Sequence, residues 1–115
     1  MPTDKTRIIN LLKSMEIPST LITEDIISFA EKVEDVVSLH AAKNKDYDGA
    51  FYKTMQKYGL VALCIRLSDK MDRLDSILKS GSIQVQDESI EDTLKDIAAY
   101  AIMGLVKLGR KNETV

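Results

Sequence analysis

The stretch that decides the fold is residues 60–80, which read LVALCIRLSDKMDRLDSILKS. Its apolar residues recur at steps of three and four, the spacing that places them on one face of an α-helix. That face carries Leu60, Leu63, Cys64, Leu67, Met71, Leu74 and Leu78. Lys79 and Gly81 follow as an ordinary helix C-terminus. We therefore predict a helix over 60–80, with Cys64 buried as a small apolar side chain.

The same periodicity predicts two helices before this one. The first runs over 4–15 and has Thr3 as its N-cap. It must end before Pro18, because proline disfavours the helical conformation of the residue that precedes it. The second helix starts near Thr23, which can cap it, and fades over 44–48.

A last helix is predicted over 87–108, after a loop through residues 83–85 that could hold a short extended stretch. Residues 50–59 form either a short helix that covers the core or irregular chain. These elements predict an all-α fold, an antiparallel bundle of about four main helices. Apolar residues on second faces of the last two helices, Ile65, Met103 and Val106, predict that the bundle is completed by self-association into a dimer or larger homo-oligomer.

The length and composition fit one domain. The chain has 115 residues, of which 44 % are apolar, so it can bury a core without disulfide or metal cross-links. We expect a single all-helical domain over 1–115. Within it, 1–20 is the N-terminal helix and its break, 23–108 the core bundle, and 109–115 a polar tail.

Charge and residue usage exclude several function classes. The 16 basic and 18 acidic residues give a net charge of −2, which argues against binding to duplex nucleic acid. Cys64 is the only cysteine and His40 the only histidine, so neither a disulfide framework nor a thiolate-rich or multi-histidine metal site is expected. No signal-like N-terminal run and no continuous apolar segment of membrane-spanning length occurs, so we expect a cytoplasmic protein with no membrane partner.

Acidic residues line one face of the last predicted helix. Glu88, Asp92 and Asp96 are spaced four apart, and the same line continues into Tyr100 and Met103. Like charges at this spacing destabilise a bare helix, whereas a bound divalent cation would turn the repulsion into attraction. The other interpretation is a solvated face whose acids favour the positive end of the helix dipole.

The helix over 60–80 supplies complementary groups. Asp69 and Asp72 lie three apart, with Arg66, Lys70 and Arg73 beside them. Carboxylates are the ligands that Mg²⁺ and Mn²⁺ prefer, and interleaved cations suit phosphate oxygens. Two antiparallel helices that carry such acids can hold ions between them. Mixed acids and bases are also common on solvated helices, so this alternative stays open.

A second polar cluster lies where the second helix ends. It comprises His40, Lys43, Lys45, Asp46 and Tyr47. One interpretation is a substrate-facing segment, in which Lys43 contacts phosphate and Tyr47 stacks on or hydrogen-bonds to a base. The other is an ordinary helix C-terminus, where cations complement the dipole.

Several of these runs together resemble a known family. They are Lys43-Asn44-Lys45-Asp46-Tyr47-Asp48, then Ile65-Arg66-Leu67-Ser68-Asp69-Lys70 with Arg73-Leu74, and finally Asp87-Glu88-Ser89 with Asp92-Thr93-Leu94-Lys95-Asp96 and Tyr100. Over residues 38–108 the chain is similar to the nucleotide modification associated domain 1 family. That family is frequent in phage and prophage genomes and is considered akin to the MazG-like all-α nucleotide pyrophosphohydrolases.

The resemblance implies an activity and a site. MazG-like proteins use two acidic pairs on successive helices to bind magnesium and to cleave a nucleoside triphosphate to monophosphate and pyrophosphate. The matching residues are Asp69 with Asp72 and Asp92 with Asp96. Three of these are Asp where Glu is expected, and the second pair is spaced by four instead of three, although Glu88 and Glu91 could supply longer arms.

Three hypotheses follow. The first is a Mg²⁺- or Mn²⁺-dependent pyrophosphohydrolase acting on a nucleoside triphosphate or modified nucleotide. The second is a non-catalytic protein that binds or sequesters a nucleotide or nucleotide signal, and the third is a helical interaction module without a small ligand. In the first, the metal-binding residues are Asp69, Asp72, Asp92 and Asp96, and the catalytic residues are these four with Glu88. The substrate-binding residues are Lys43, Asp46, Tyr47, Arg66, Lys70, Arg73 and Tyr100.

Overall fold

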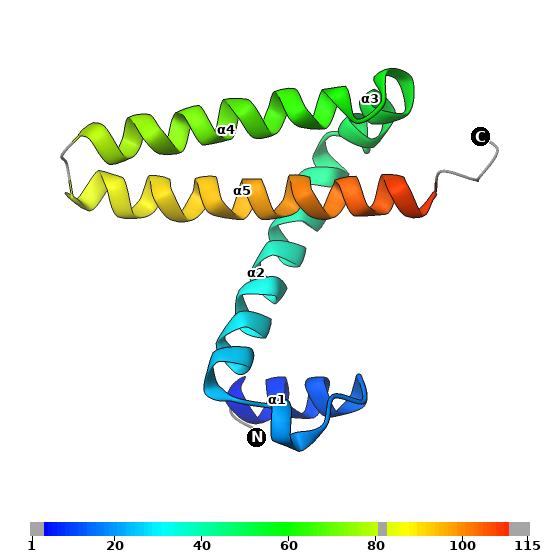
Figure 1. Ribbon diagram of the computed structural model, residues 1–115, viewed down its shortest axis with the longest axis vertical. Coiled ribbons are helices and arrows are strands. Elements are labelled where there is room, and N and C mark those ends of the chain that lie inside the picture. The colour runs from blue at the N-terminus through cyan, green and yellow to red at the C-terminus, as the bar shows by residue number, and fades with distance from the viewer. Residues whose placement is uncertain (1–3, 81–82, 111–115) are drawn as a thin grey trace. The chain divides into compact units, whose positions relative to one another are not determined.

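The structure, a computed structural model, describes residues 4–80 and 83–110, with only the backbone described over 83–89. Its regular structure within these ranges is entirely helical, which confirms the all-α part of the fold prediction (Figure 1). The elements are α1 (Asp4–Ser14), the 3-10 helix η1 (Ser19–Leu21), α2 (Glu24–Asp46), α3 (Ala50–Tyr58), α4 (Val61–Ser80) and α5 (Ile83–Gly109). No helix in the described ranges is both long and apolar enough to cross a membrane.

Local sequence signals explain most helix boundaries. The hydroxyl oxygen of Thr23 accepts a hydrogen bond from the backbone N–H of Ile26 at 3.2 Å, so Thr23 is the expected N-cap of α2. Gly59 ends α3 with φ 75° and ψ −164°, a conformation that is open to glycine and strained for other residues. Thr3, the expected cap of the first helix, lies outside the described residues.

The chain divides into two compact units, Met1–Leu39 and His40–Val115, here called the N-terminal and C-terminal units. Helix α2 contributes to both of them, with its last turns belonging to the C-terminal unit. The single domain expected from the length stays a prediction.

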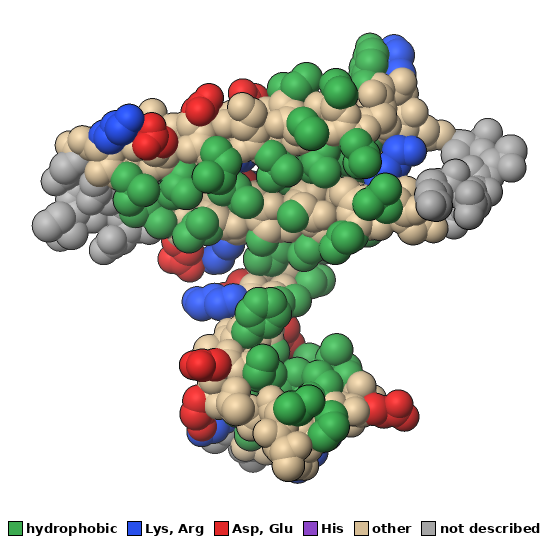
Figure 2. Space-filling model, in the orientation of Figure 1, with side chains coloured by type: hydrophobic (Ala, Val, Ile, Leu, Met, Phe, Trp, Pro, Cys, Tyr) green, Lys and Arg blue, Asp and Glu red, His purple; other side chains and the backbone are tan. Residues whose placement is uncertain are grey.

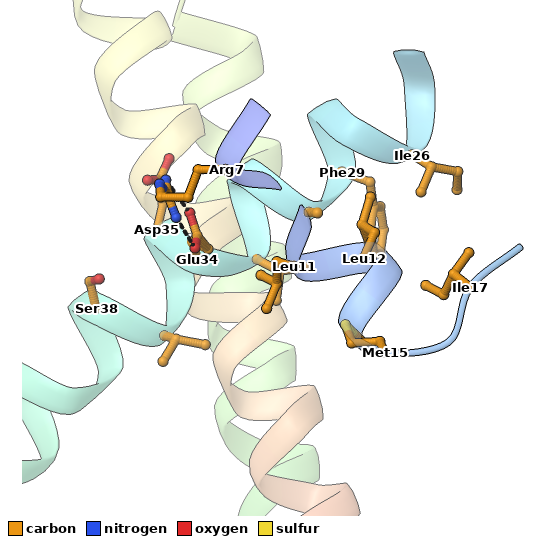
Figure 3. Close-up of a pocket in the computed structure, with 13 residues that line it drawn as sticks. Arg7, Leu11, Leu12, Met15, Ile17, Ile26, Phe29, Glu34, Asp35 and Ser38 are labelled. Atoms are coloured by element: carbon orange, nitrogen blue, oxygen red, sulfur yellow. Dashed lines mark hydrogen bonds and ion pairs between the residues drawn. The ribbon is translucent and has the colours of Figure 1, made fainter. Parts of the chain in front are cut away.

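The N-terminal unit is a helical hairpin with a small core. Ile8, Leu12 and Ile27 are its buried residues. An open apolar hollow of about 830 Å³ lies between α1 and the first turns of α2 (Figure 3). At its edge, the guanidinium of Arg7 donates two hydrogen bonds, of 2.6 and 2.9 Å, to the carboxylate of Glu34.

The C-terminal unit is built on α4 and α5, which lie side by side and run antiparallel, with α3 packed near one end (Figure 1). Met55, Ala62 and Met103 form its buried core. Gly104 is buried where α5 meets α4. A Cβ atom at that position would lie only 2.5 Å from Cδ2 of Leu63, so there is no room for a side chain. The absence of a side chain therefore lets the two helices approach closely.

Several expectations about the C-terminal unit were wrong, and two of them concern the start of α5 and the burial of Cys64. The loop expected through 83–85 is helical, since α5 begins at Ile83. Cys64 is exposed and not buried. The partly covered residues of α4 are spaced four and three apart, the pattern expected for a helix that packs lengthwise against another. They form the seam of α4 and are Leu63, Leu67, Lys70, Leu74 and Ile77.

Much of the apolar surface of α4 and α5 lies outside that seam. Ile65 on α4 is 56 % exposed, and Leu94 and Leu105 on α5 are 50 % and 67 % exposed. Figure 2 shows hydrophobic side chains gathered along one face of this helix pair. Met103, expected to face a second copy, is instead buried in the unit's own core. An apolar face therefore remains uncovered.

Candidate functional site

The last turns of α2 place four polar or aromatic side chains on one face. His40, Lys43, Asn44 and Tyr47 follow the spacing i, i+3, i+4 and i+7, so they lie above one another on the helix and the turn that continues it. The turn is tight, because Asp48 and Gly49 both have positive φ angles, of 52° and 65°. It brings the chain directly into α3.

Side chains from α3, α4 and α5 enclose the space in front of this face. Asp96, Ala99, Tyr100 and Met103 again follow the spacing i, i+3, i+4 and i+7, here along α5. Together they form a cavity of about 340 Å³, near the lower end of the size range of small-molecule sites. Its lining comprises His40, Lys43, Asn44, Tyr47, Ala50, Phe51, Lys70, Asp96, Ala99, Tyr100 and Met103.

Two lysines converge on one carboxylate in this cavity. The ammonium of Lys43 lies 2.9 Å from Oδ1 of Asp96, and the ammonium of Lys70 lies 3.0 Å from Oδ2. The three side chains come from three helices, and Asp96 is only 20 % exposed. Both carboxylate oxygens are engaged, and the cluster keeps a net charge of +1, so the cavity is electropositive.

These contacts shift two pKa values. Burial acts to raise the pKa of Asp96, but the hydrogen bonds from Lys43 and Lys70 outweigh it, and the pKa lies below its usual value. The hydrogen bond to Asp96 raises the pKa of Lys43, although partial burial opposes the shift. Both groups are therefore charged at neutral pH.

Aromatic rings supply the other walls. The rings of Phe51 and Tyr100 meet edge to face, with centroids 4.9 Å apart and an interplanar angle of 74°. The Nε2 atom of His40 lies 3.1 Å from the hydroxyl oxygen of Tyr52, which fixes the orientation of the imidazole. The cavity thus pairs a cationic cluster with aromatic surface, which suits a ligand that has an anionic group and a flat ring.

The structure brings together five of the predicted site residues and leaves the others apart. Lys43, Tyr47, Lys70, Asp96 and Tyr100 line the cavity. The remaining predicted residues with described side chains are exposed and do not line it, namely Asp46, Arg66, Asp69, Asp72, Arg73 and Asp92. The side chain of Glu88 lies outside the described part of the chain.

The acids fit a divalent cation only in part. Among the described side chains, no three Asp, Glu, His or Cys residues are grouped as a ready-made metal site. Asp92 lies one turn before Asp96 on α5, but it is exposed and does not line the cavity. Magnesium in phosphate sites is commonly held by one or two carboxylates together with the phosphates of the substrate. A cation would therefore have to arrive with a phosphate.

The lining contains residues that the sequence prediction did not select. They are His40, Asn44, Ala50, Phe51, Ala99 and Met103. Helical spacing from Lys43, Tyr47 and Asp96 would have found His40, Asn44, Ala99 and Met103, but not Ala50 and Phe51, which lie beyond the turn. Phe51 lies at the cavity because the turn at Asp48 and Gly49 redirects the chain, and helical periodicity does not predict the direction of a turn.

Comparison with known protein families finds a match for the C-terminal unit. A family model described as nucleotide modification associated domain 1 matches residues 43–108, more than half of the chain. Every residue of the cavity lining except His40 falls within that range. No curated protein and no solved structure matches the chain.

Proposed function

The chain belongs to the nucleotide modification associated domain 1 family, and from this premise we propose that the cavity of the C-terminal unit binds a nucleotide. The observation that carries the proposal is the convergence of Lys43 and Lys70 on Asp96 inside a cavity with aromatic walls. Ammonium groups are common phosphate ligands. In this proposal they hold the phosphate chain, and Phe51, Tyr100 and Tyr47 contact the base or sugar.

We further propose that the bound nucleotide is hydrolysed in a MazG-like reaction. A water oxygen bonds to the α-phosphorus, the bond to the bridging oxygen breaks, and pyrophosphate leaves while a proton is released. Lys43 and Lys70 would neutralise charge on the phosphate chain, and Asp92 and Asp96 would hold the cation and orient the water. A Mg²⁺ or Mn²⁺ ion, when bound, supplies charge stabilisation for the leaving pyrophosphate.

A second candidate function is nucleotide binding without hydrolysis. It is favoured by the position of Asp69 and Asp72, which are exposed on α4 and do not line the cavity. Small displacements of catalytic groups are costly for rate, whereas the lysine pair can still hold phosphate. This alternative explains the departures of the acidic pattern from the MazG-like one.

One experiment separates these functions. The protein is incubated with a panel of nucleoside triphosphates and modified nucleotides in Mg²⁺, and both products and retained ligands are followed by mass spectrometry. Pyrophosphate together with a monophosphate supports the hydrolase. A retained but intact nucleotide supports binding alone. Neither product nor retained ligand contradicts both and favours the helical interaction module.

A further inference from the structure

The N-terminal unit has too little core to be stable by itself. It spans Met1–Leu39, and its core cluster holds only Ile8, Leu12 and Ile27. Units below about 40 residues usually need disulfides, metal ions or association with another surface. The only cysteine, Cys64, lies outside this unit, and no three metal-binding side chains are grouped within the described residues. Association with another helical surface is therefore what this unit requires.

The hollow between α1 and α2 is the surface available for such an association (Figure 3). Its most exposed apolar side chains come from both sides of the hairpin, since Met15 is 61 % and Phe29 69 % exposed. Four further apolar residues along α2 follow steps of four, three and four, the spacing of a helix that packs lengthwise against partner helices. They are Ile26, Ala30, Val33 and Val37.

The two helices of the hairpin carry opposite charges. Helix α1 has three basic residues and one acidic residue, a net charge of +2, whereas residues 24–39 of α2 have one basic and five acidic residues, a net charge of −4. In a bundle of two hairpins, each α1 can lie beside the α2 of the other copy as well as its own, so that neighbouring helices attract one another. An anionic membrane surface, by contrast, would be repelled by α2. The surface is therefore complementary to a second copy of itself.

We propose that the N-terminal units of two copies pair through this hollow, as two helical hairpins that form a four-helix bundle about a two-fold axis. The Phe29 side chain of each copy enters the hollow of the other. This interface is distinct from the apolar face of α4 and α5. It lies outside residues 43–108, the range of the family match, and does not depend on nucleotide binding.

Sedimentation of the full-length protein at low micromolar concentration tests the pairing. Phe29→Glu and Met15→Glu each put a carboxylate into the contact, and neither residue belongs to the core cluster of the hairpin itself. We expect each change to weaken the pairing at least about tenfold, as for a central interface residue, and thereby to halve the mass of the particle. Ser28→Glu is the matched control, because Ser28 is exposed on the same helix and does not line the hollow.

Hydrogen exchange shows which interface is lost. In Phe29→Glu, α1 and residues 24–39 should lose protection while α4 and α5 keep theirs. A monomeric wild type would overturn the proposal, and this measurement requires no variant to fold. Two helical variants with the mass and the α1 protection of wild type would overturn it as well. So would a loss of mass in Ser28→Glu equal to that in Phe29→Glu, since the effect would then not come from the hollow.

Discussion

At the scale of single residues, Asp96 and Lys43 tie the stability of the C-terminal unit to pH. The pKa of Asp96 is lowered in the folded protein, so its contribution is fully present above the unfolded value of about 3.9 and is lost as the pH falls through the folded value. The pKa of Lys43 is raised, so its contribution is present below about 10.4 and is lost as the pH rises through the folded value.

Urea unfolding between neutral pH and about pH 3 measures the acid side of this dependence. Wild type is expected to lose more stability than Asp96→Asn over that range, because only wild type must protonate a carboxylate that two lysines hold. The stabilities of the two proteins should approach each other as the pH falls. Parallel curves for the two proteins would show that the ion-pair cluster contributes nothing to folding.

Phe51 is the residue that tests the aromatic wall. Its ring meets Tyr100 edge to face in the cavity, so Phe51→Ala should remove a contact for the base of a bound nucleotide. Stacking of a base on an aromatic side chain contributes about 1–3 kcal/mol, so affinity should fall by roughly tenfold to a hundredfold. Tyr58→Ala is the control, since Tyr58 lies on the same helix, is 63 % exposed and does not line the cavity. If both variants lose the same nucleotide affinity in calorimetry, Phe51 does not contact the base.

At the scale of elements, the two units are expected to lose structure separately. Ile8 is fully buried in the core of the N-terminal unit, so Ile8→Ala should cost about 2–5 kcal/mol there. We expect hydrogen exchange to accelerate in α1 and in the first turns of α2, while α4 and α5 keep their protection. Met55→Ala, in the core of the C-terminal unit, should give the opposite pattern. Loss of protection throughout the chain in both variants would show one cooperative domain.

Helices were predictable from the sequence because their signals are local. The apolar period over 60–80 and the Thr23 cap correspond to α4 and to the start of α2. The period does not say which side of an amphipathic helix faces inward when both sides carry apolar residues. Cys64 was therefore assigned to the buried side, whereas α4 turns Leu63 and Lys70 toward its seam.

The site was predictable only along single helices. Lys43 and Asp96 were identified from the sequence as site residues, but their ion pair joins positions 53 residues apart, and helical spacing carries no information on such a contact. The inward position of Lys70 could not be predicted either, because charged residues mostly lie on solvated helix faces. Only its ion pair with Asp96 explains why this lysine lies within the seam.

At the scale of the whole molecule, the uncovered apolar face of α4 and α5 predicts assembly. Isolated apolar residues on a surface are ordinary, but an extended apolar face usually marks an interface. We expect the protein to sediment as a dimer or larger at micromolar concentration. Leu105→Glu places a charge at a position that is 67 % exposed on this helix pair and should shift the mass toward the monomer. Gln56→Glu, an exposed change on α3, should not. A monomeric wild type would contradict the prediction.

The role proposed for Lys43 and Lys70 is to bind the phosphates of a nucleotide. It is tested most directly by calorimetric titration of wild type, Lys43→Ala, Lys70→Ala and Lys45→Ala with a nucleoside triphosphate in excess Mg²⁺. Each cavity lysine should contribute about 1.5–3 kcal/mol as a charged hydrogen bond, so its loss should weaken binding by roughly tenfold to a hundredfold. Lys45 is exposed on the same helix as Lys43 and outside the cavity, and its loss should leave the affinity unchanged. Equal affinities for all four proteins would rule out phosphate binding by Lys43 and Lys70.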